Sequence, residues 1–262
     1  MFDEYKPIAE QYDIDLEKLK EEKGELNEEI IQKYIMENYY PKIKEEKKIT
    51  GIRKIISKRL HQSYSQAIHV TINMEVIMDK LFELRNKIDN KPSLTVIMLK
   101  LLSQALKEMP ELNSTFDGEK ITTYETINIA VATDTANGLI TPVLREVDKK
   151  DINTFTKEYE EIIRKARNGE LKEKDMVGAT FTVTNLGMFG VTSFTPIINP
   201  PQVAILGINT IKTALLLEEN LQKRVKLGTL SLTVDHRVID GALGARFLQQ
   251  VKNHFEKSEE IV

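Results

Sequence analysis

The sequence predicts a mixed α/β fold built around one large β-sheet and preceded by a small helical segment. Three observations favour this fold. Strand-like and helix-like patterns alternate from about residue 50 to the end, a proline and a run of charges set this part apart from the first 40 residues, and the composition is that of a globular protein. Apolar residues make up 41% and charged residues 29% of the 262 residues. A chain of this length can form one large and one small domain.

The first 40 residues are mostly charged and contain short helical patterns. Asn27 can cap a helix over residues 28–40, where isoleucine and tyrosine recur at helical spacing. Pro41 ends this helix, and the charged residues that follow cannot pack into a core. We therefore expect a small helical segment at residues 1–40, a linker at 41–49 and the main domain at 50–262.

The main domain alternates helices and strands in chain order. Its expected helices carry apolar residues on one face, and its expected strands are short runs rich in β-branched and aliphatic residues. Thr50 can cap the first helix, and Asn137-Gly138 is a turn signal between two strands. Helices are expected at 50–63, 78–88, 94–109, 151–167 and 240–255. Strands are expected at 70–76, 127–132, 139–144, 179–184, 203–208 and 226–234.

The composition excludes several kinds of site. The chain has no cysteine, so disulfides, thiolate metal sites and a cysteine nucleophile are excluded. A net charge of −3 argues against a general nucleic-acid-binding surface. The first residues do not resemble a signal peptide, and no apolar run approaches the about 18 residues of a membrane-spanning helix. We expect a cytoplasmic protein with no membrane segment and no metal site.

The clearest chemical signal lies at the end of the last expected strand. A run rich in β-branched residues leads into His236, and Asp240 opens a helix four residues later, followed by Gly241. A neutral imidazole with a pKa of about 6.5 can take a proton from a thiol with a pKa of about 8.5. This pattern predicts a general base. The same pattern also fits a polar residue at a strand end followed by an ordinary helix cap.

Five motifs, in order along the chain, resemble one enzyme family. Residues 235–242, with the pattern Asp-His-Arg-x-x-Asp-Gly-Ala, resemble the dihydrolipoamide acyltransferases, or E2 components, of 2-oxoacid dehydrogenase complexes. Residues 52–60, 137–143, 180–187 and 198–207 resemble four further segments of that family. The resemblance covers residues 50–262. It implies a chloramphenicol-acetyltransferase-like mixed-sheet sandwich with flanking helices.

The resemblance implies a role for three residues. His236 would deprotonate the thiol of coenzyme A, or of dihydrolipoamide in the reverse direction. Thr184 matches a Ser or Thr whose hydroxyl lies near the oxyanion of the tetrahedral intermediate, although a β-branched residue also suits a strand for packing alone. Asp240 would orient the site by pairing with an arginine of the opening helix, and the sequence does not choose between Arg53 and Arg59.

Four further polar residues complete the set of candidates. Asn185, next to Thr184, is a weaker candidate for binding the cofactor. The histidines outside the motif are expected to be structural or exposed. They are His61, His69 and His254. His69 lies at a family position often occupied by histidine, but the proline that usually precedes it is Ile68 here.

Two departures from the family concern its accessory domains. E2 chains normally begin with a lipoyl domain, and none is recognisable here, so we expect the lipoyl group on a separate domain or protein. Residues 5–40 resemble the peripheral-subunit-binding domain at only a few positions, with Asp13 where glycine is usual. This segment is more acidic than basic. It is either a degenerate domain of that kind or a solvated helical tail.

The resemblance also implies an assembly and partners. Family members are homotrimers, often assembled further into cages, with the active site between subunits and coenzyme A as a substrate. Their partners are lipoyl domains and the decarboxylase and dihydrolipoamide dehydrogenase components. The chain ends on Ile261 and Val262, which resemble an apolar knob that joins trimers; a disordered tail is the alternative. Two other functions stay open: a free-standing acetyltransferase that uses coenzyme A and a small hydroxyl substrate, and a non-catalytic scaffold.

Overall fold

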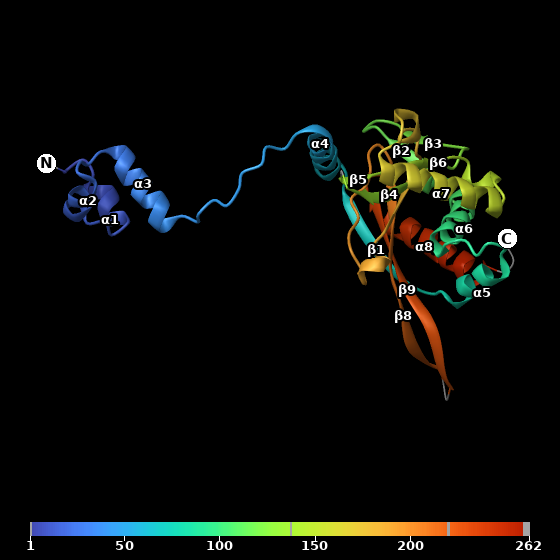
Figure 1. The fold of residues 1–262 in the computed structure, drawn as a ribbon. Coiled ribbons are helices and arrows are strands. Elements are labelled where there is room, and N and C mark those ends of the chain that lie inside the picture. Colours follow the sequence, from blue (N-terminus) through green and yellow to red (C-terminus); the bar gives the residue numbers. More distant parts are fainter. Residues whose placement is uncertain (1, 137, 219–220, 259–262) are drawn as a thin grey trace. The chain divides into compact units, whose positions relative to one another are not determined.

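The chain consists of two compact units, Met1–Ile49 and Thr50–Val262 (Figure 1). The structure is a computed structural model that describes residues 2–136, 138–218 and 221–258. Each unit has its own cluster of buried apolar side chains, and each is therefore described by itself. Among the described residues, no helix has both the length and the apolar character that a membrane span requires.

The N-terminal unit consists of three short helices, α1 (Lys6–Gln11), α2 (Leu16–Lys23) and α3 (Glu28–Tyr39). Its core is small and entirely aliphatic. The buried side chains are Ala9, Ile14, Leu19, Ile31 and Ile35. A core of this size gives modest stability, because a unit this small buries little of its surface.

Side-chain caps define the ends of these helices. The Asn27 side chain accepts a hydrogen bond from Ile30 N (2.9 Å), as the sequence predicts for the start of α3. Asp15 caps α2 in the same way, accepting from Lys18 N (3.0 Å). Asp13 has a φ of 48°, in the left-handed region that favours glycine. The backbone therefore explains why glycine is usual at this position of the related domains, and aspartate is one of the residues that tolerates it.

The C-terminal unit is built around a seven-stranded sheet in the order β1-β9-β8-β7-β4-β5, with β6 paired to β4. Strand β7 runs parallel to both β4 and β8, whereas β9 runs antiparallel to β1 and β8. The large sheet that the sequence predicts, and the mixed strand directions that the family resemblance implies, are therefore confirmed. The strands are β1 (His69–Ile77), β4 (Ile129–Thr135), β5 (Gly138–Ile140), β6 (Val143–Leu144), β7 (Phe181–Asn185), β8 (Ala204–Glu218) and β9 (Leu221–Asp235). A separate two-stranded sheet consists of β2 (Ser114–Phe116) and β3 (Ile121–Thr123).

Helices cover the apolar face of the sheet. Helix α8 packs closely on β1, because a Cβ added at Gly244 would lie 2.8 Å from Ile72 Cδ1. The α-helices of this unit are α4 (Gly51–Gln66), α5 (Asp79–Lys87), α6 (Leu94–Glu108), α7 (Ile152–Asn168) and α8 (Gly241–Glu256). Among the described side chains of α4, only Ser63 is buried. The described residues of this unit also form four short 3₁₀ helices, η1 (Pro110–Leu112), η2 (Val147–Lys149), η3 (Glu173–Asp175) and η4 (Gly187–Phe189).

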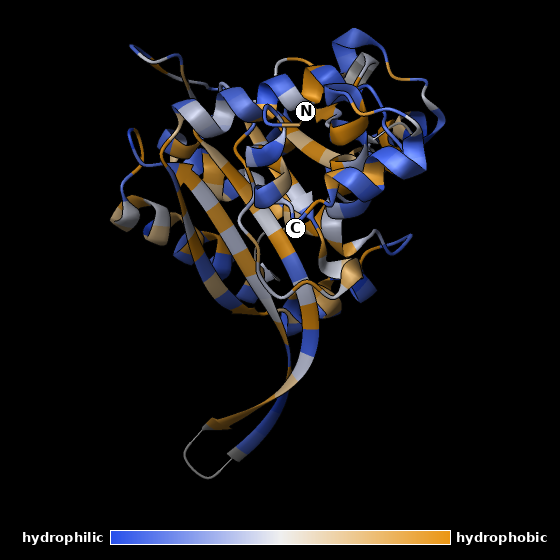
Figure 2. Ribbon diagram, turned by 90° about the vertical axis from the view of Figure 1, so that its left-hand side faces the viewer, coloured by the Kyte–Doolittle hydropathy of each residue, from blue (hydrophilic) through white to orange (hydrophobic). Residues whose placement is uncertain are grey.

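The two longest strands extend well beyond the expected ranges. The sequence predicts strands at 203–208 and 226–234, but β8 and β9 have 15 residues each. Their far ends form a hairpin that projects from the sheet (Figures 1 and 2). We call residues 212–217 and 222–226 of this hairpin the distal ribbon. Charged residues interrupt the apolar ones there, and Leu217 is 77% exposed, so the ribbon lacks the pattern of a buried strand.

Smaller differences have equally local causes. The strand expected at 139–144 is divided into β5 and β6, with Pro142 between them, and proline cannot donate to a ladder. Strands β2 and β3 have three residues each, which is too short for a periodic pattern. The expected turn is present, since Thr135 of β4 pairs with Gly138 of β5. Thr50 precedes α4 but its side chain makes no cap hydrogen bond. Asn137 and the apolar pair Ile261 and Val262 lie outside the described residues.

Candidate active site

His236 lies in the turn that joins β9 to α8. Asp235 ends the strand, and its carbonyl accepts hydrogen bonds from Val238 N and Ile239 N, both at 2.9 Å. His236 N donates to the carbonyl of Ile68, just before β1 (2.8 Å). The histidine itself is exposed in the single chain. The structure therefore places His236 at a strand-to-helix junction, with its ring accessible to a thiol.

An ion pair joins the two residues on either side of His236. Arg237 Nε lies 3.0 and 3.1 Å from the carboxylate oxygens of Asp235, and Nη2 lies 2.6 Å from one of them. Asp235 is only 3% exposed, and its carboxylate also accepts from Ile68 N (3.3 Å) and Arg237 N (3.1 Å). Burial acts to raise the pKa of Asp235, but the hydrogen bonds from Arg237 and Ile68 together hold it below its usual value. Sequence alone does not single out this pair, because only the fold buries the aspartate.

Asp240 is the N-cap of α8. Its Oδ1 accepts a hydrogen bond from Leu243 N at 2.7 Å, and the residue is otherwise exposed. Neither Arg53 nor Arg59 forms an ion pair with it within the part of the chain that the structure describes. The capping role that the sequence also allows is therefore present, whereas the expected pairing with α4 is not formed in a single chain.

Thr184 lies near the end of β7, on the face of the sheet away from the main core. Its neighbour Val183 points into that core, and successive side chains of a strand alternate between faces. Thr184 pairs with Gly207 of β8, where a Cβ would come within 2.8 Å of the Phe194 ring. The hydroxyl of Thr184 makes no hydrogen bond to any residue that the structure describes. It is therefore available to donate to a ligand.

Asn185 is occupied by the fold. Its Oδ1 accepts from Gly187 N (2.9 Å), which turns the chain out of β7, and its Nδ2 donates to Thr95 Oγ1 (3.2 Å) in α6. Both ends of the amide are thus used within the protein. The residue ties the end of β7 to the start of α6 and holds the segment next to Thr184 in place.

A pocket of about 430 Å³ opens beside Thr95, between the first turn of α6 and helix α7. Ser93 caps α6 by accepting from Val96 N (3.3 Å), and Tyr159 and Arg167 line the opposite side. Burial raises the pKa of Tyr159, against the lowering effects of a hydrogen bond with Thr95 and of the charge of Arg167. Sequence reasoning missed this pocket because its residues come from two helices and form no motif.

The two arginines of this pocket differ in their surroundings. Arg164 is held by Glu161 and Glu170, with nitrogen-to-oxygen distances of 3.0 Å to each. Hydrogen bonds from Arg164 and Lys165 lower the pKa of Glu161 to about 2. Arg167 forms no ion pair among the described residues. Arg167 is therefore the cation of this pocket that has charge to offer to an anion.

Thr184 and His236 do not meet within one chain. Thr184 lies opposite Gly207, which lies opposite Ser231 on β9. Asp235, the residue before His236, is four residues further along β9. Two strand spacings and four residues correspond to about 10 Å across the sheet and about 13 Å along it. Within a single protomer, therefore, Thr184 and His236 cannot contact the same thioester at the same time.

The other histidines have structural surroundings or are exposed, as expected. Ile198 N donates to His69 Nε2 (3.1 Å), so the ring proton lies on Nδ1, which is 3.1 Å from the Ala67 carbonyl. His254 is buried, with Nε2 3.0 Å from Glu108 Oε2. His61 is exposed on α4. None of the three lies, like His236, in a turn that leads from a strand into a helix.

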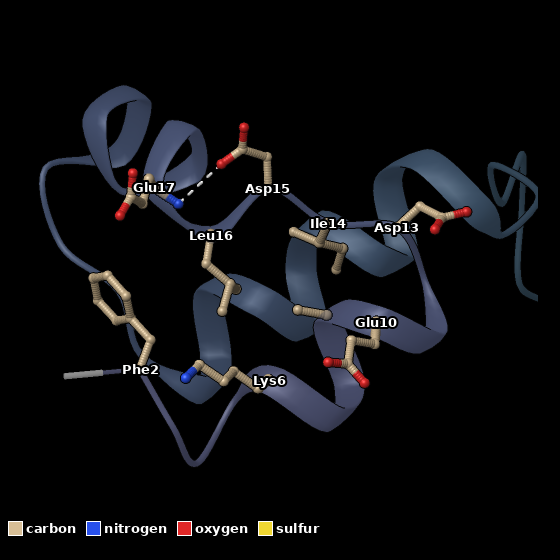
Figure 3. Close-up of a pocket in the computed structure, with 9 residues that line it drawn as sticks. Phe2, Lys6, Glu10, Asp13, Ile14, Asp15, Leu16 and Glu17 are labelled. Atoms are coloured by element: carbon tan, nitrogen blue, oxygen red, sulfur yellow. Dashed lines mark hydrogen bonds between the residues drawn. The ribbon is translucent and has the colours of Figure 1, made fainter.

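The N-terminal unit has a hollow of its own, of about 620 Å³, beside α1 and the start of α2 (Figure 3). Phe2 and Leu16 form part of its wall, and Glu10, Asp13 and Glu17 add acidic groups. Among the described residues that line it there is no histidine, serine or threonine. This hollow therefore lacks the groups that acyl transfer requires.

Comparison with known families establishes the family of the chain. Residues 41–262 match the model of the 2-oxoacid dehydrogenases acyltransferase catalytic domain. The chain belongs to this family. The chain is similar to the dihydrolipoyllysine-residue acetyltransferase components of the pyruvate dehydrogenase complexes of Dictyostelium discoideum (36% identical over 220 residues, 81% of this chain and 35% of that protein) and Rickettsia bellii (35% over 214 residues, 79% and 51%). It thus spans between 35% and 51% of the length of these two relatives.

Solved structures of this family agree with the chain in fold. The probable dihydrolipoamide acetyltransferase of Listeria monocytogenes is 36% identical, with a TM-score of 0.78 over 81% of this chain and 94% of that chain. The Azotobacter vinelandii dihydrolipoamide acetyltransferase is 33% identical, with a TM-score of 0.80 over 86% and 96%. A chloramphenicol acetyltransferase, 18% identical, shares the fold with a TM-score of 0.51 over 76% and 94%. The family and the chloramphenicol-acetyltransferase-like fold implied by the sequence motifs are both confirmed.

Proposed function

We propose that the protein moves an acyl group between dihydrolipoamide and coenzyme A, as the E2 core of a 2-oxoacid dehydrogenase complex. The observation that carries the proposal is the spacing of Thr184, His236 and Asp240. The Azotobacter vinelandii structure concerns the role of a serine, a histidine and an asparagine in catalysis, and these are separated by 52 and 4 residues. The three residues here have the same separations, with threonine and aspartate as the counterparts of serine and asparagine.

The proposed chemistry uses the exposed ring of His236 and the available hydroxyl of Thr184. The imidazole takes the proton of the coenzyme A thiol, and the sulfur attacks the carbonyl carbon of acyl-dihydrolipoamide. The resulting oxyanion accepts a hydrogen bond from Thr184. When the intermediate collapses, the bond to the dihydrolipoamide sulfur breaks and that sulfur takes the proton back from the imidazolium. The products are acyl-coenzyme A and dihydrolipoamide.

The distance between Thr184 and His236 in one chain supports a site shared between copies. We propose a homotrimer in which His236 of one protomer faces Thr184 of the next, assembled further into a larger particle. Helix α4 has exposed apolar residues that a second copy could cover, with Ile55 61% and Tyr64 71% exposed. The cubic core of a pyruvate dehydrogenase complex is a similar structure, 33% identical with a TM-score of 0.80.

The pocket beside Thr95 suits a phosphate of coenzyme A. The N-terminus of α6 presents unpaired backbone amides and the positive end of the helix dipole, and Arg167 adds a cation. Asn185 joins this pocket to the strand that carries Thr184. Arg167→Met is expected to raise KM for coenzyme A with little change in kcat. Arg164→Met, which removes an arginine already neutralised by two glutamates, is expected to raise KM less.

The proposed partners follow from the same assignment. The lipoyl group would come from a separate domain or protein. The decarboxylase would load the acyl group onto it, and dihydrolipoamide dehydrogenase would reoxidise the dihydrolipoyl group after acyl transfer. Residues 1–40 are proposed as a degenerate peripheral-subunit-binding unit, 41–49 as the linker and 50–262 as the catalytic domain. The cytoplasmic location stays a prediction.

Acceptor choice tests the proposed activity. Purified protein is incubated with acetyl-coenzyme A and either dihydrolipoamide or a small hydroxyl compound such as chloramphenicol, and the released coenzyme A is followed. Transfer to dihydrolipoamide is expected. Transfer to the hydroxyl compound alone would favour a free-standing acetyltransferase. No transfer by an intact particle would favour a scaffold.

A further inference from the structure

The two residues on either side of His236 form a closed unit around it. Asp235 and Arg237 are joined by three nitrogen-to-oxygen contacts between 2.6 and 3.1 Å. A bond between side chains two positions apart closes a ring that contains the backbone of the residue between them. The ring restricts the backbone torsions of His236 and hence the direction in which its imidazole leaves the chain. We call this ion pair the clasp.

The clasp is fastened to neighbouring elements at several points. The Asp235 carboxylate accepts from Ile68 N (3.3 Å), while Ile68 O accepts from His236 N (2.8 Å). The turn is thus tied to the start of β1 through both peptide groups of one residue. The Arg237 guanidinium lies 4.9 Å from the centre of the Phe116 ring in β2. The position of the turn is therefore set by β1, β2 and β9 together.

The cost of burying this carboxylate points to a purpose beyond packing. Asp235 is 3% exposed, and a carboxylate removed from water is unfavourable unless it is paired and fully hydrogen-bonded. An apolar residue could end the strand without that cost. The side chain of Arg237 is 33% exposed, so its charge would also be accommodated without a partner.

We propose that the clasp positions His236 for proton transfer, so that Asp235 and Arg237 are positioning residues of the acyl-transfer reaction. This inference rests on the function proposed above for His236. Neither residue touches the reacting atoms. The clasp fixes the turn, and the turn aims the ring. Displacing a catalytic group by about 1 Å costs on the order of a hundredfold in rate.

Two substitutions loosen the clasp in different ways. Asp235→Asn keeps the shape of the side chain but removes the charge that Arg237 pairs with. Arg237→Met keeps much of the length of a partly exposed side chain and leaves the buried aspartate with its backbone donors, so it preserves the fold if Asp235→Asn does not. Both are expected to lower kcat by about tenfold to a hundredfold with KM unchanged. The double variant should lose no more than the worse single variant, because the two residues act as one unit.

Asn128→Ala is the matched control. Asn128 also ties two loops together, donating to Gly178 O (2.9 Å) and accepting from Glu146 N (2.9 Å), but at the start of β4. A loss of stability alone would lower activity in all three variants alike. Positioning lowers kcat in the two clasp variants and leaves the control at the wild-type value.

The ring of His236 provides a readout that does not depend on catalysis. In protein with isotope-labelled histidine, the His236 resonance is assigned by its absence in His236→Ala. It is expected to shift or broaden in Asp235→Asn and Arg237→Met and to stay in place in Asn128→Ala. An unchanged resonance together with near-normal kcat in folded clasp variants would overturn the proposal. The resonance reports whether the clasp positions the ring, whatever the activity of His236→Ala. Activity retained by His236→Ala would contradict a different proposal, the role of His236 as the base.

Discussion

The two ends of strand β9 are held very differently. At its C-terminal end, Asp235 is 3% exposed and its carboxylate accepts five hydrogen bonds. At its N-terminal end, β9 pairs with β8 alone, because pairing with β1 stops at Leu227 and pairing of β8 with β7 stops at Ile208. Leu215 and Leu217 of the distal ribbon are 65% and 77% exposed. Strand β9 thus begins in a two-stranded hairpin with exposed leucines and ends in a turn that several hydrogen bonds hold in place.

This difference shows how a single element can separate two requirements. A reactive side chain needs a fixed direction, and the turn obtains it from bonds to several strands. The distal ribbon holds no reactive side chain in a fixed direction, and a two-stranded hairpin on its own is marginally stable. Substitutions at the turn should therefore change rate, whereas substitutions in the ribbon should leave the rate of the chemical step unchanged.

The largest expected effect is that of removing the proposed base at the fastened end. His236→Ala should lower acetyl transfer from acetyl-coenzyme A to dihydrolipoamide by about 10²–10⁴-fold. The melting temperature should stay the same, because the residue is exposed. Leu217→Ala in the distal ribbon is the control and should keep the wild-type rate. Turnover close to normal in His236→Ala would remove the distinction between the two ends.

Thr184 tests whether the neighbouring strand contributes to the same chemistry. Thr184→Ala should lower kcat by about 10²–10³-fold, because it removes a donor to the oxyanion. KM should change little, since the donor acts mainly in the transition state. Thr184→Ser keeps the hydroxyl and should retain most of the rate. Steady-state kinetics that gave equal rates for the alanine and serine variants would reduce Thr184 to a packing residue.

The free energy of unfolding should depend on the buried part of β9 and hardly at all on the distal ribbon. Leu232 is fully buried in the part of β9 that lies between β1 and β8, so Leu232→Ala should lower the free energy of unfolding by about 2–5 kcal/mol. Leu217→Ala, at the exposed end of the partner strand, should change it by no more than about 0.5 kcal/mol. Urea unfolding of both variants at one protein concentration measures the difference. Equal losses would mean that the ribbon is covered in solution.

The smallest expected effect is a dependence of the free energy of unfolding on pH, caused by Asp235 in the turn at His236. The folded-state pKa of Asp235 is lower than its usual value. Its contribution to stability is therefore fully present above the unfolded pKa of about 3.9 and is lost as the pH falls through the lower folded pKa. Asp235→Asn should be less stable than the wild type at neutral pH, and the gap should narrow below about pH 4. A gap that is independent of pH would show that charge is not the cause.

The sequence predicts the turn at His236 but not the contacts that hold this turn in place. A β-branched run, a histidine and a helix-capping aspartate are local signals, so the strand, the turn at His236 and the start of α8 could be predicted. The contacts that hold Asp235 and Arg237 come from Ile68, just before β1, and from Phe116 of β2, which are distant in sequence. The separation of Thr184 from His236 follows from the order of β7, β8 and β9, which no local pattern contains.

The distal ribbon was missed for a related reason. Its leucines and cations do not alternate as they do in a strand with one buried face. Its length follows from pairing between β8 and β9 beyond the reach of β1 and β7, because β1 stops opposite Leu227 and β7 opposite Ile208. The Arg167 pocket shows the same limit, because helices α6 and α7 bring its residues together from separate parts of the chain.

The charges of the distal ribbon have a consequence for the behaviour of the protein in solution. Apart from Lys226, whose peptide groups bond to Met78 and Asp79, the outer edges of the ribbon pair with no further strand that the structure describes and can template pairing with another chain. Lys212, Lys223, Arg224 and Lys226 lie in its two strands, and residues 212–217 and 222–226 contain no acidic residue. Ribbons of like charge repel one another over about 30 Å in 0.01 M salt but over only about 10 Å in 0.1 M salt. High salt concentration should therefore promote aggregation of isolated chains, and low salt concentration should keep them from aggregating.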